Sequence, residues 1–279
     1  GPSGPMLTRS RTAAPNRSRL AAGMRAARVA LLLAAPAAGL RLGSDRCACM
    51  PWAGVYAEHG VKCGQGHELG NAGSLLERVP AKYLPLENAA LQGFYDEFCV
   101  KFYQRVSFAG CFNKKFGPHP DQWCYVSAGC DGAVPVPGTD VAIHNCSQAH
   151  GDRLMSGAAP EELNSLAKKD NLEVGLFGKI SYVLEAEKWS DVEAASGLDQ
   201  EKMKLPHVME SLYGLRWNGP REATAPAKAK LEAVRAGGAA TIFDSDNGHG
   251  GGTLILGKKA YGFLPVEGGS FGYACVQGC

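Results

Sequence analysis

Cysteine spacing constrains the fold of this chain more than any other feature. Eight of the ten cysteines lie within residues 47–146, and the other two lie in the last five residues. Such a density is typical of exported domains that are held together by disulfides. Because the number is even, none is left over if all of them pair. Every cysteine is therefore a disulfide candidate: Cys47, Cys49, Cys63, Cys99, Cys111, Cys124, Cys130, Cys146, Cys275 and Cys279.

The spacing does not determine which cysteines pair, since ten half-cystines allow a very large number of pairings. Cys47 and Cys49 are separated by a single residue, and a disulfide that closes so short a ring is strained. We therefore expect these two cysteines to pair with two different partners, which would tie down the N-terminal end of the mature chain.

Residues 1–40 have the composition of a targeting leader. They contain six arginines and no acidic residue, and they end in the apolar run "VALLLAAPAAGL" at 29–40. This run is too short to span a bilayer, which needs about 20 residues, but it suits an export signal with a cleavage-like Ala-Pro-Ala at 35–37. Two interpretations remain open: a plain secretory signal, or a transit-like segment followed by an export signal, as in thylakoid-lumen proteins. Both start the mature chain near 38–45, outside the cytosol.

The body of the chain is mildly acidic once the leader is set aside. Subtracting the six leader arginines from the 29 Lys and Arg leaves 23 basic residues against 27 Asp and Glu. This balance argues against a nucleic-acid partner. No apolar run after the leader is long enough for a bilayer, so the mature chain is predicted to have no transmembrane span of its own.

The pattern along the chain predicts an α+β fold with a disulfide-rich N-terminal part, in which short amphipathic helices pack on a small antiparallel sheet. Residues 41–150 form the cysteine-rich region, 151–238 a helical region and 239–279 a small β region. The periodicity predicts a helix over about 86–104, helices that begin at Pro160 and Pro226, and helices around 190–197 and 205–217. Strands are predicted at 123–126, 240–243, 253–256, 260–264 and 271–275.

The segment "DSDNGHGGGTLILGKK" at 244–259 contains the residues that most suggest chemistry. Its Gly-x4-Gly-Lys lacks the hydroxyl residue and the following helix of a phosphate-binding loop, and its acids do not fit a calcium loop. The glycines and the short polar side chains favour a hairpin turn. The alternative is a metal site that uses Asp244, Asp246 and His249, because carboxylates and imidazole are capable ligands.

Two further sets of residues invite a chemical interpretation. Cys47, Cys49, Cys63 and His67 have zinc-ligand types, but in an oxidising compartment disulfides explain the cysteines better. A Cys/His nucleophile needs a free thiolate beside a base, and no histidine lies in a recognisable catalytic motif. We therefore predict no catalytic residue, no bound metal and no cofactor.

The loop "SFAGCFNKKFGPHP" interleaves aromatic and basic residues. In one interpretation the phenylalanines point into the core of a disulfide-anchored loop. In the other, the loop contacts a membrane face or a protein partner, because aromatics anchor interfaces and lysines favour anionic surfaces. The helix at 205–217 is a second candidate contact. The residues of the loop that would make the contact are Phe108, Phe112, Lys114, Lys115, Phe116 and His119.

Several motifs together resemble a family of uncharacterised, cysteine-rich exported proteins of dinoflagellate algae. The resemblance covers most of residues 47–263 and implies no catalytic residues, but it makes a photosynthetic plastid a plausible destination. The motifs that carry it are "CACMPWAGVY", "VKCGQGHEL", "QWCYVSAGC", "PEELNSLAKKDNLEVGL" and "FDSDNGHGGGTLILGKKAYGF".

Together these features predict a non-catalytic binding or structural protein of an oxidising lumen. The thylakoid lumen is favoured over the secretory pathway, and the expected partner is a protein complex at a membrane surface. The specific expectation is an accessory subunit on the lumenal side of a photosystem or light-harvesting assembly. Two alternatives stay open, a secreted or vacuolar Cys/His hydrolase and a metal-binding module.

Overall fold

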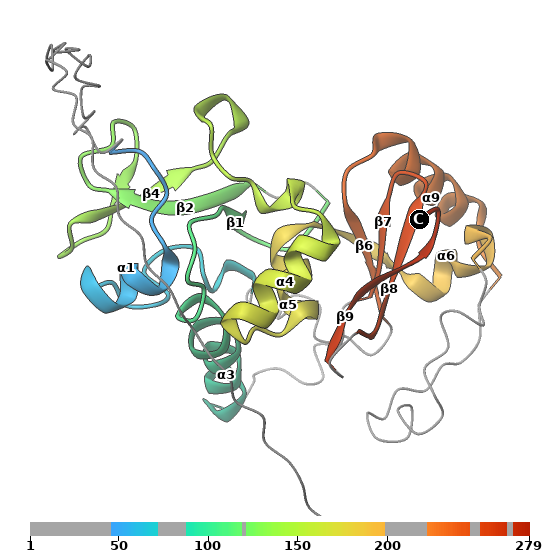
Figure 1. Ribbon diagram of the computed structural model, residues 1–279, viewed down its shortest axis with the longest axis horizontal. Coiled ribbons are helices and arrows are strands. Elements are labelled where there is room, and N and C mark those ends of the chain that lie inside the picture. Colours follow the sequence, from blue (N-terminus) through green and yellow to red (C-terminus); the bar gives the residue numbers. More distant parts are fainter. Residues whose placement is uncertain (1–45, 72–87, 119–120, 199–221, 246–251, 267–269) are drawn as a thin grey trace, which may run out of the picture. The chain divides into compact units, whose positions relative to one another are not determined.

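The computed structural model describes residues 46–71, 88–118, 121–198, 222–245, 252–266 and 270–279. All of these residues belong to one structural unit, Gly43–Cys279, which is coloured along the sequence in Figure 1. The leader at 1–40 and the predicted helix at 205–217 lie outside the described residues. Within them, no helix has the length and the apolar character that crossing a membrane requires.

The cysteine-rich part forms a four-stranded antiparallel sheet, with strand order β1-β2-β4-β3. Helix α1 precedes this sheet, and a longer helix that starts as α3 continues as the π-helical stretch η2. The predicted strand at 123–126 is confirmed as β2. The bounds of these elements are α1 (Trp52–Glu58), α3 (Asn88–Tyr95), η2 (Asp96–Tyr103), β1 (Phe112–Asn113), β2 (Gln122–Ser127), β3 (Val134–Pro135) and β4 (Val141–Asn145).

Strand β2 carries the centre of the first core. Its first five residues are buried, because side chains on both faces of the strand are covered. The ring of Trp123 packs edge-on against Trp52 of α1, with the ring centroids 4.8 Å apart. Trp52 donates its indole hydrogen to the carbonyl of Gly110 at 2.8 Å. Because Trp52 both packs on β2 and bonds the chain before β1, α1 is held against the sheet.

The helix predicted at 86–104 is confirmed, with a change of pitch at its centre. In its second half the turns widen, and Gln104 N–H reaches back five residues to the carbonyl of Cys99 at 3.0 Å. The side chains of Phe98, Phe102 and Tyr103 are buried there. Such wide turns occur as single features inside helices. Here they accompany a buried helix face from which Phe102 and Tyr103 pack against Phe112 of β1.

The second half of the chain contributes helices and a five-stranded sheet with strand order β5-β6-β7-β8-β9. The four strands predicted at the C-terminal end are confirmed as β6 to β9. The bounds are η3 (Gln148–His150), η4 (Met155–Gly157), α4 (Pro160–Asp170), α5 (Val174–Ser181), β5 (Val183–Lys188), α6 (Trp189–Ser196), α9 (Ala225–Gly237), β6 (Thr241–Asp244), β7 (Thr253–Leu256), β8 (Lys259–Pro265) and β9 (Phe271–Gln277).

The C-terminal sheet has one more strand than the sequence predicts. Strand β5 comes from the region expected to be helical, and it pairs with β6 in parallel, whereas the other pairs are antiparallel. Parallel neighbours need a crossover connection, and here residues 189–240, with α6 and α9, make that connection. The run of alternating residues at β5 is short and lies between two helices, so its pattern does not stand out.

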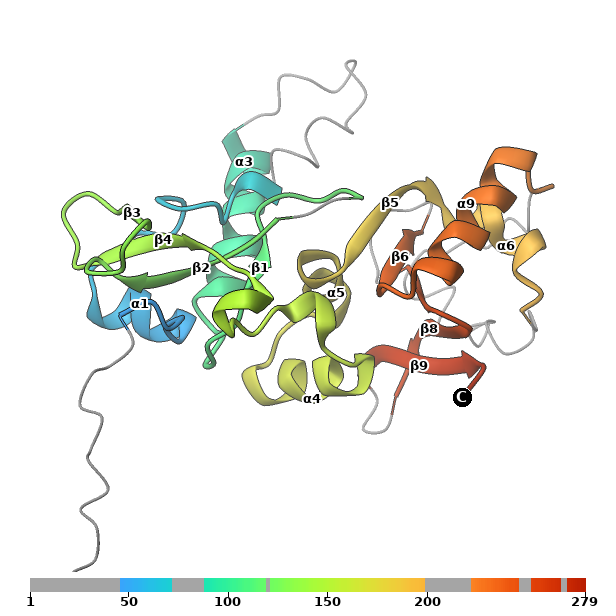
Figure 2. The ribbon, with the colours of Figure 1, turned by 90° about the horizontal axis from the view of Figure 1, so that it is seen from above.

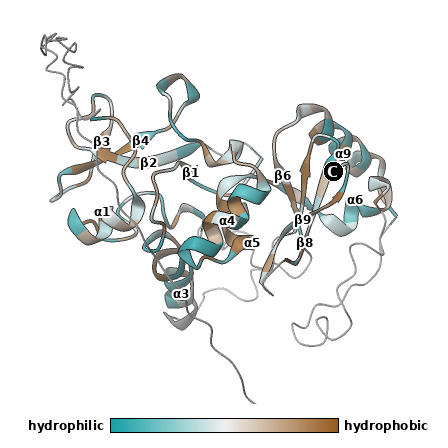
Figure 3. Cartoon of the chain, in the orientation of Figure 1, coloured by the Kyte–Doolittle hydropathy of each residue, from teal (hydrophilic) through white to brown (hydrophobic). Residues whose placement is uncertain are grey.

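Apolar residues cover both faces of this sheet, and neighbouring residues of a strand belong to different clusters. Ile242 and Leu254 join the large core that also contains Trp52, while Phe243 and Ile255 pack with α6 and α9. This follows from the alternation of side chains along a strand. In Figures 1 and 2 helices α4 and α5 lie between the two sheets, and Figure 3 shows the hydrophobic character of the C-terminal strands.

Two buried amide side chains join the first sheet to the end of α5. Asn113 of β1 donates to the carbonyl of Tyr182 at 2.8 Å. Gln122 of β2 donates to the carbonyl of Ser181 at 2.9 Å and to the side-chain oxygen of Asn113 at 2.7 Å. These bonds satisfy main-chain carbonyls at a helix end, so they align the two halves of the chain.

Helix ends follow local signals closely. Pro160 occupies the first turn of α4, and the helix ends at Asn171 with a φ of 53°. Gly197 ends α6 at a φ of 66°, as predicted, because a left-handed residue costs glycine little. The start of α6 lies one residue before the predicted range of 190–197. The helix begins at Trp189, and the N–H of Lys188 donates to Asp191 at 3.2 Å.

Helix α4 also contacts the outer edge of the C-terminal sheet. The side-chain amide of Asn164 donates to the carbonyl of Tyr273 at 2.9 Å, and it accepts from the N–H of Tyr273 at 3.0 Å. Tyr273 lies in β9, the last strand of the sheet. A single side chain therefore pairs with both main-chain groups of one residue on that edge.

Candidate functional site

All ten cysteines form disulfides. Cys47 and Cys49 pair with different partners, as their spacing predicts, and no cysteine is free. Four bridges link parts of the segment 47–146, and the fifth closes a short loop at the end of the chain. The pairs are Cys47–Cys130, Cys49–Cys124, Cys63–Cys99, Cys111–Cys146 and Cys275–Cys279.

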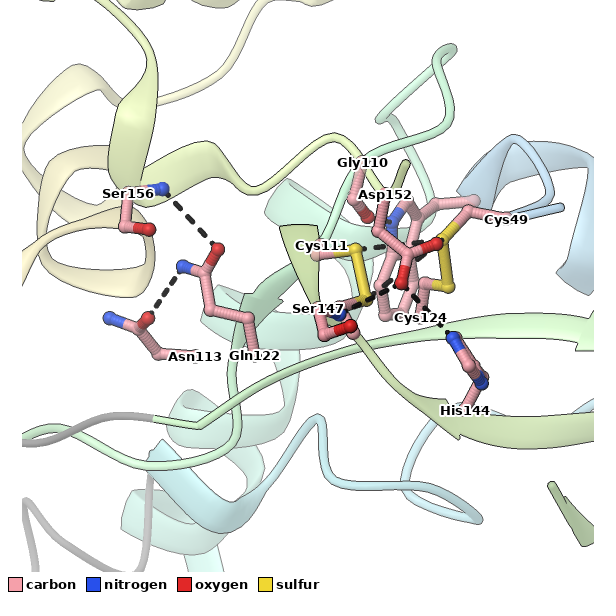
Figure 4. Close-up of a disulfide and its surroundings, with 12 residues drawn as sticks. Cys49, Gly110, Cys111, Asn113, Gln122, Cys124, His144, Ser147, Asp152 and Ser156 are labelled. Atoms are coloured by element: carbon pink, nitrogen blue, oxygen red, sulfur yellow. Dashed lines mark hydrogen bonds and ion pairs between the residues drawn. A yellow bond between two sulfur atoms is a disulfide. The ribbon is translucent and has the colours of Figure 1, made fainter. Parts of the chain in front are cut away.

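Two of the bridges are in direct contact, as Figure 4 shows. The Sγ atom of Cys49 lies 3.5 Å from Sγ of Cys111 and 3.9 Å from Sγ of Cys146. Cys49 is bonded to Cys124 on β2. Because disulfide sulfurs carry no hydrogen, these are packing contacts and not hydrogen bonds. The paired bridges join the N-terminal segment to the first sheet and to the chain after β4.

A histidine and an aspartate lie beside the paired bridges. Nε2 of His144, on β4, is 3.1 Å from Oδ2 of Asp152, and the two side chains are only 10% and 6% exposed. The N–H of Ser147 donates to the same oxygen at 2.8 Å. The other oxygen, Oδ1, lies 4.0 Å from Sγ of Cys49. That sulfur has no hydrogen to donate, so among the described residues no hydrogen-bond donor to Oδ1 is found.

A second histidine completes this group. His150 ends the short helix η3 and is exposed, and its ring centroid is 5.7 Å from that of His144. One ligand atom from each of His144, His150 and Asp152 lies within 4.8 Å of the others. Two imidazoles and a carboxylate form a common set of transition-metal ligands.

Sequence reasoning did not identify this group. The spacing His-x5-His-x-Asp is present in the sequence, but it matches no common metal motif. The three side chains meet because β4 ends at Asn145 and the chain turns back through η3. This turn depends on the Cys111–Cys146 bridge and on Gly151, whose φ is 78°.

An open hollow of about 250 Å³ adjoins the loop that carries Asp152. Gln148, Asp152 and Glu162 are among its lining residues. Arg153 also lines the hollow, but its guanidinium is held by Glu162 at 2.6 Å and lies 5.1 Å from the ring centroid of Phe108. The hollow therefore gives solvent a route to the loop without placing a free cation beside the buried carboxylate.

The alternative of a metal site that uses Asp244 is not supported by the residues that the structure describes. Asp244 is buried, and its two oxygens contact Lys179 at 2.8 Å and Lys188 at 3.2 Å. Two ammonium groups compensate its charge, so the carboxylate has no need of a metal ion. Asp246 and His249 lie outside the described residues.

The hairpin interpretation of this segment is confirmed, because β6 and β7 pair as antiparallel neighbours on either side of it. Gly252 has a φ of 64°, and a Cβ atom there would lie 2.4 Å from the carbonyl oxygen of Phe243. A glycine is therefore required on two grounds, the left-handed conformation and the close approach of the neighbouring strand.

The predicted contact loop is mostly part of the core. Phe112 and Phe116 are buried, so they are not available for a partner, and the inward-pointing interpretation is correct for both. Phe108 and Lys114 are half-buried, and Lys115 is exposed. The last residue of the predicted contact set, His119, lies outside the described residues.

The alternative zinc set also separates in the structure. Cys47, Cys49 and Cys63 belong to three different disulfides. His67 packs edge-on against Trp123, with the ring centroids 5.2 Å apart. Burial, and the charge of Lys114 to a smaller extent, lower the pKa of His67. These thiols are therefore consumed by disulfides, and the imidazole takes part in aromatic packing.

A buried carboxylate in the first core is a further feature that the sequence did not reveal. Glu68 is fully buried and accepts from the hydroxyls of Tyr125 at 2.6 Å and Tyr56 at 2.9 Å. It also accepts from the N–H of Gly66 at 2.9 Å. Three donors satisfy this carboxylate, so its role is structural.

Comparison of the chain with known protein families, with curated proteins and with solved structures finds no match.

Proposed function

We propose that this protein is a non-catalytic binding or structural protein of an oxidising compartment. The observation that carries the proposal is the pairing of all ten cysteines into disulfides. Five disulfides indicate an oxidising environment such as a secreted or lumenal one. A thiol that is consumed in a disulfide is no longer a nucleophile, which counts against the alternative of a cysteine hydrolase.

The other reactive side chains described above also support a structural role. Two lysines neutralise Asp244, and three donors hold Glu68. A catalytic carboxylate has to present an oxygen or a proton to a substrate. Neither of these two does so, because their oxygens face lysines and tyrosines inside the fold.

The more specific part of the proposal is an accessory role on the lumenal side of a photosynthetic membrane complex. It is supported by the composition of residues 1–40, which fits a transit-like segment followed by an export signal, by the resemblance to exported algal proteins and by the disulfides. Of the predicted contact residues that the structure describes, Lys115 is exposed, with Lys114 half-buried beside it. We expect these lysines, rather than the buried phenylalanines, to meet an anionic membrane or protein surface.

Two measurements on the natively isolated protein test the proposal separately. A thiol count under denaturing, non-reducing conditions should give zero, and one or more free thiols would restore the hydrolase alternative. Gradient sedimentation of detergent-solubilised membranes should place the protein with a large complex. Migration only in the soluble fraction would contradict the accessory role while leaving the disulfide result intact.

A charge-reversal pair locates the contact. We expect Lys114→Glu with Lys115→Glu to abolish co-sedimentation, because it replaces cations with anions at the membrane-facing loop. The matched control is Lys168→Glu with Lys169→Glu in the last turn of α4, which changes the net charge equally. Retained co-sedimentation of the loop variant would place the contact elsewhere, and loss in both double variants would show a charge effect that is not specific to this loop.

A further inference from the structure

We propose that His144, His150 and Asp152 form a binding site for a divalent transition-metal ion, with Zn²⁺ as the reference cation. The proposal is independent of the function proposed above. It rests on three side chains whose ligand atoms lie within 4.8 Å of one another. Zn²⁺ is bound in proteins by imidazole nitrogens and carboxylate oxygens at about 2.0–2.2 Å, so a small inward movement of these atoms would enclose it.

The buried carboxylate provides the driving force. Asp152 is 6% exposed, and a buried charge is costly unless a partner compensates it. One oxygen accepts from Ser147 and faces His144, and within the described part of the chain the other oxygen meets a disulfide sulfur at 4.0 Å. Arg153 is the neighbouring cation, but Glu162 already neutralises it. A metal ion held between His144 and Asp152 would compensate this charge.

The site is held in place before any ion binds. His144 is fixed by its position on β4, where it pairs with Cys124 of the neighbouring strand β2. The carbonyl of Ser147 accepts from the N–H groups of His150 at 3.2 Å and Asp152 at 3.3 Å, which closes the turn. The Cys111–Cys146 bridge anchors the start of this turn. A preformed site loses less conformational entropy when it binds.

The exposure of His150 indicates a metal site that is open to solvent. Three protein ligands leave at least one coordination position for water or another ligand, which is typical of sites that exchange ligands rather than of closed structural sites. His150 is on the surface, so an ion can reach it from solvent. His144 and Asp152 then supply the two buried ligands.

The nearby sulfurs are not part of the site while the disulfides are intact. Cys49, Cys111, Cys124 and Cys146 lie close enough together to hold a metal ion as four thiolates, but a disulfide sulfur is not a thiolate. Reduction would therefore create a competing site a few ångströms away. For this reason the test uses oxidised protein, and a parallel thiol count confirms that it stays oxidised.

The chain offers a matched control pair. His59 Nδ1 lies 2.8 Å from Oδ1 of Asp140, at a surface where the aspartate is 73% exposed. This pair has one imidazole and one carboxylate, but it is not part of any group of three ligands among the described residues. If surface His–Asp pairs alone bound the ion, His59 would contribute as much as His150.

The experiment is a titration of the oxidised, chelator-treated full chain with Zn²⁺ by isothermal calorimetry at pH 7.5. We expect one site, and we expect His150→Gln to weaken it by at least about 10-fold. His59→Gln should change the affinity by less than about 2-fold. Since imidazole must lose its proton to bind a metal, affinity should fall at pH 5.5. Equal losses in the two variants, or no binding in the wild type, would overturn the proposal.

A second readout separates ligation from folding. His150 is exposed, so His150→Gln should leave the unfolding midpoint of the metal-free protein unchanged while removing the Zn²⁺-induced increase. The ¹⁵N resonances of His144 and His150 should both shift on addition of Zn²⁺, whereas that of His59 should not. A shift of His150 alone would indicate surface binding without the buried pair and would also contradict the proposed site.

Discussion

Glu68 Oε1 accepts a hydrogen bond from the Tyr125 hydroxyl at 2.6 Å, where neither residue is exposed to solvent. Tyr56 shares the same oxygen, and Gly66 N–H bonds the other. The loop that contains Cys63 is thus fastened to the first sheet by a carboxylate and to η2 by the Cys63–Cys99 disulfide. Because the group is buried and fully bonded, its removal is costly.

Glu68→Gln is expected to lower the free energy of unfolding by about 1–3 kcal/mol. The amide keeps one acceptor oxygen, but its NH₂ group then faces the N–H of Gly66, so one donor is left unsatisfied. Guanidinium denaturation of the oxidised protein measures the change. The control is Glu97→Gln, which removes an exposed pair with Lys101 and should cost no more than about 0.5 kcal/mol. Equal losses of unfolding free energy in the two variants would contradict the description of Glu68 as a buried, fully bonded carboxylate.

Gly66→Ala should destabilise the fold through steric overlap. A Cβ atom at this position would lie 2.5 Å from the ring of Trp123 and 2.6 Å from the hydroxyl of Tyr125. Both rings are fully buried and cannot move aside, so we expect a loss of about 1–3 kcal/mol.

Gly93→Ala is the matched control for Gly66→Ala. Gly93 lies in α3, and a Cβ atom there would meet nothing within 4 Å. Alanine should therefore stabilise the helix by about 0.5–1 kcal/mol. The two substitutions are chemically identical, but they are expected to change the free energy of unfolding in opposite directions in the same denaturation assay. Two changes of the same sign would count against the packing described around Gly66.

Buried tyrosines predict a loss of stability at alkaline pH. Burial raises the pKa of Tyr103 and Tyr125, and the charge of Glu68 adds to the effect. Burial likewise raises the pKa of Tyr182 and Tyr273. Because the pKa is higher in the folded state than the value of about 10 in the unfolded chain, the stabilisation is complete below pH 10. It is lost progressively as the pH rises above 10.

Phenolate absorbance at 295 nm tests this prediction. At about pH 10.5 the native protein should show less phenolate absorbance than the guanidinium-unfolded protein, because the four buried hydroxyls do not ionise until the chain unfolds. The free energy of unfolding should decrease between pH 9.5 and 11. Identical titration curves for native and unfolded protein would mean that these side chains are open to solvent.

The contact between two disulfides predicts a specific exchange in Cys146→Ser. The substitution leaves Cys111 as a thiol whose sulfur lies 3.5 Å from Sγ of Cys49. Its thiolate can attack Cys49 and form a Cys49–Cys111 bond, while Cys124 leaves as a thiolate, so no net oxidation occurs. Peptide mapping after thiol blocking should find both the Cys49–Cys124 and the Cys49–Cys111 bridges.

Cys63→Ser is the control for this exchange. It frees Cys99, which is not one of the cysteines in the contact between the two bridges, so mapping should find the remaining bridges unchanged. If Cys146→Ser retained only the Cys49–Cys124 bridge after hours at pH 8, the two bridges would not be close enough to exchange.

Features that the sequence predicts well are those with strong local causes. Pro160 begins α4 and Gly197 ends α6 because these residues act through their own backbone. Strands β6 to β9 alternate between two apolar faces and are separated by glycine turns, so their pattern is visible without tertiary information.

Features that depend on distant partners could not be predicted in the same way. Strand β5 pairs in parallel with β6, which lies about fifty residues further along the chain. The burial of Phe112 depends on rings from α1 and α5, because the same Phe/Lys pattern also suits an exposed loop. Likewise His144 and Asp152 meet only because a disulfide and a left-handed glycine turn the chain back.

The bonds from Asn164 to the main chain of Tyr273 have a consequence for self-association. A free edge strand offers unpaired N–H and C=O groups that can recruit a strand from another molecule. On β9 a side chain from α4 already occupies both groups at one position. A strand from a second copy would have to break both bonds before it could pair with β9 at Tyr273, which makes this stretch of the edge a poor template for sheet extension.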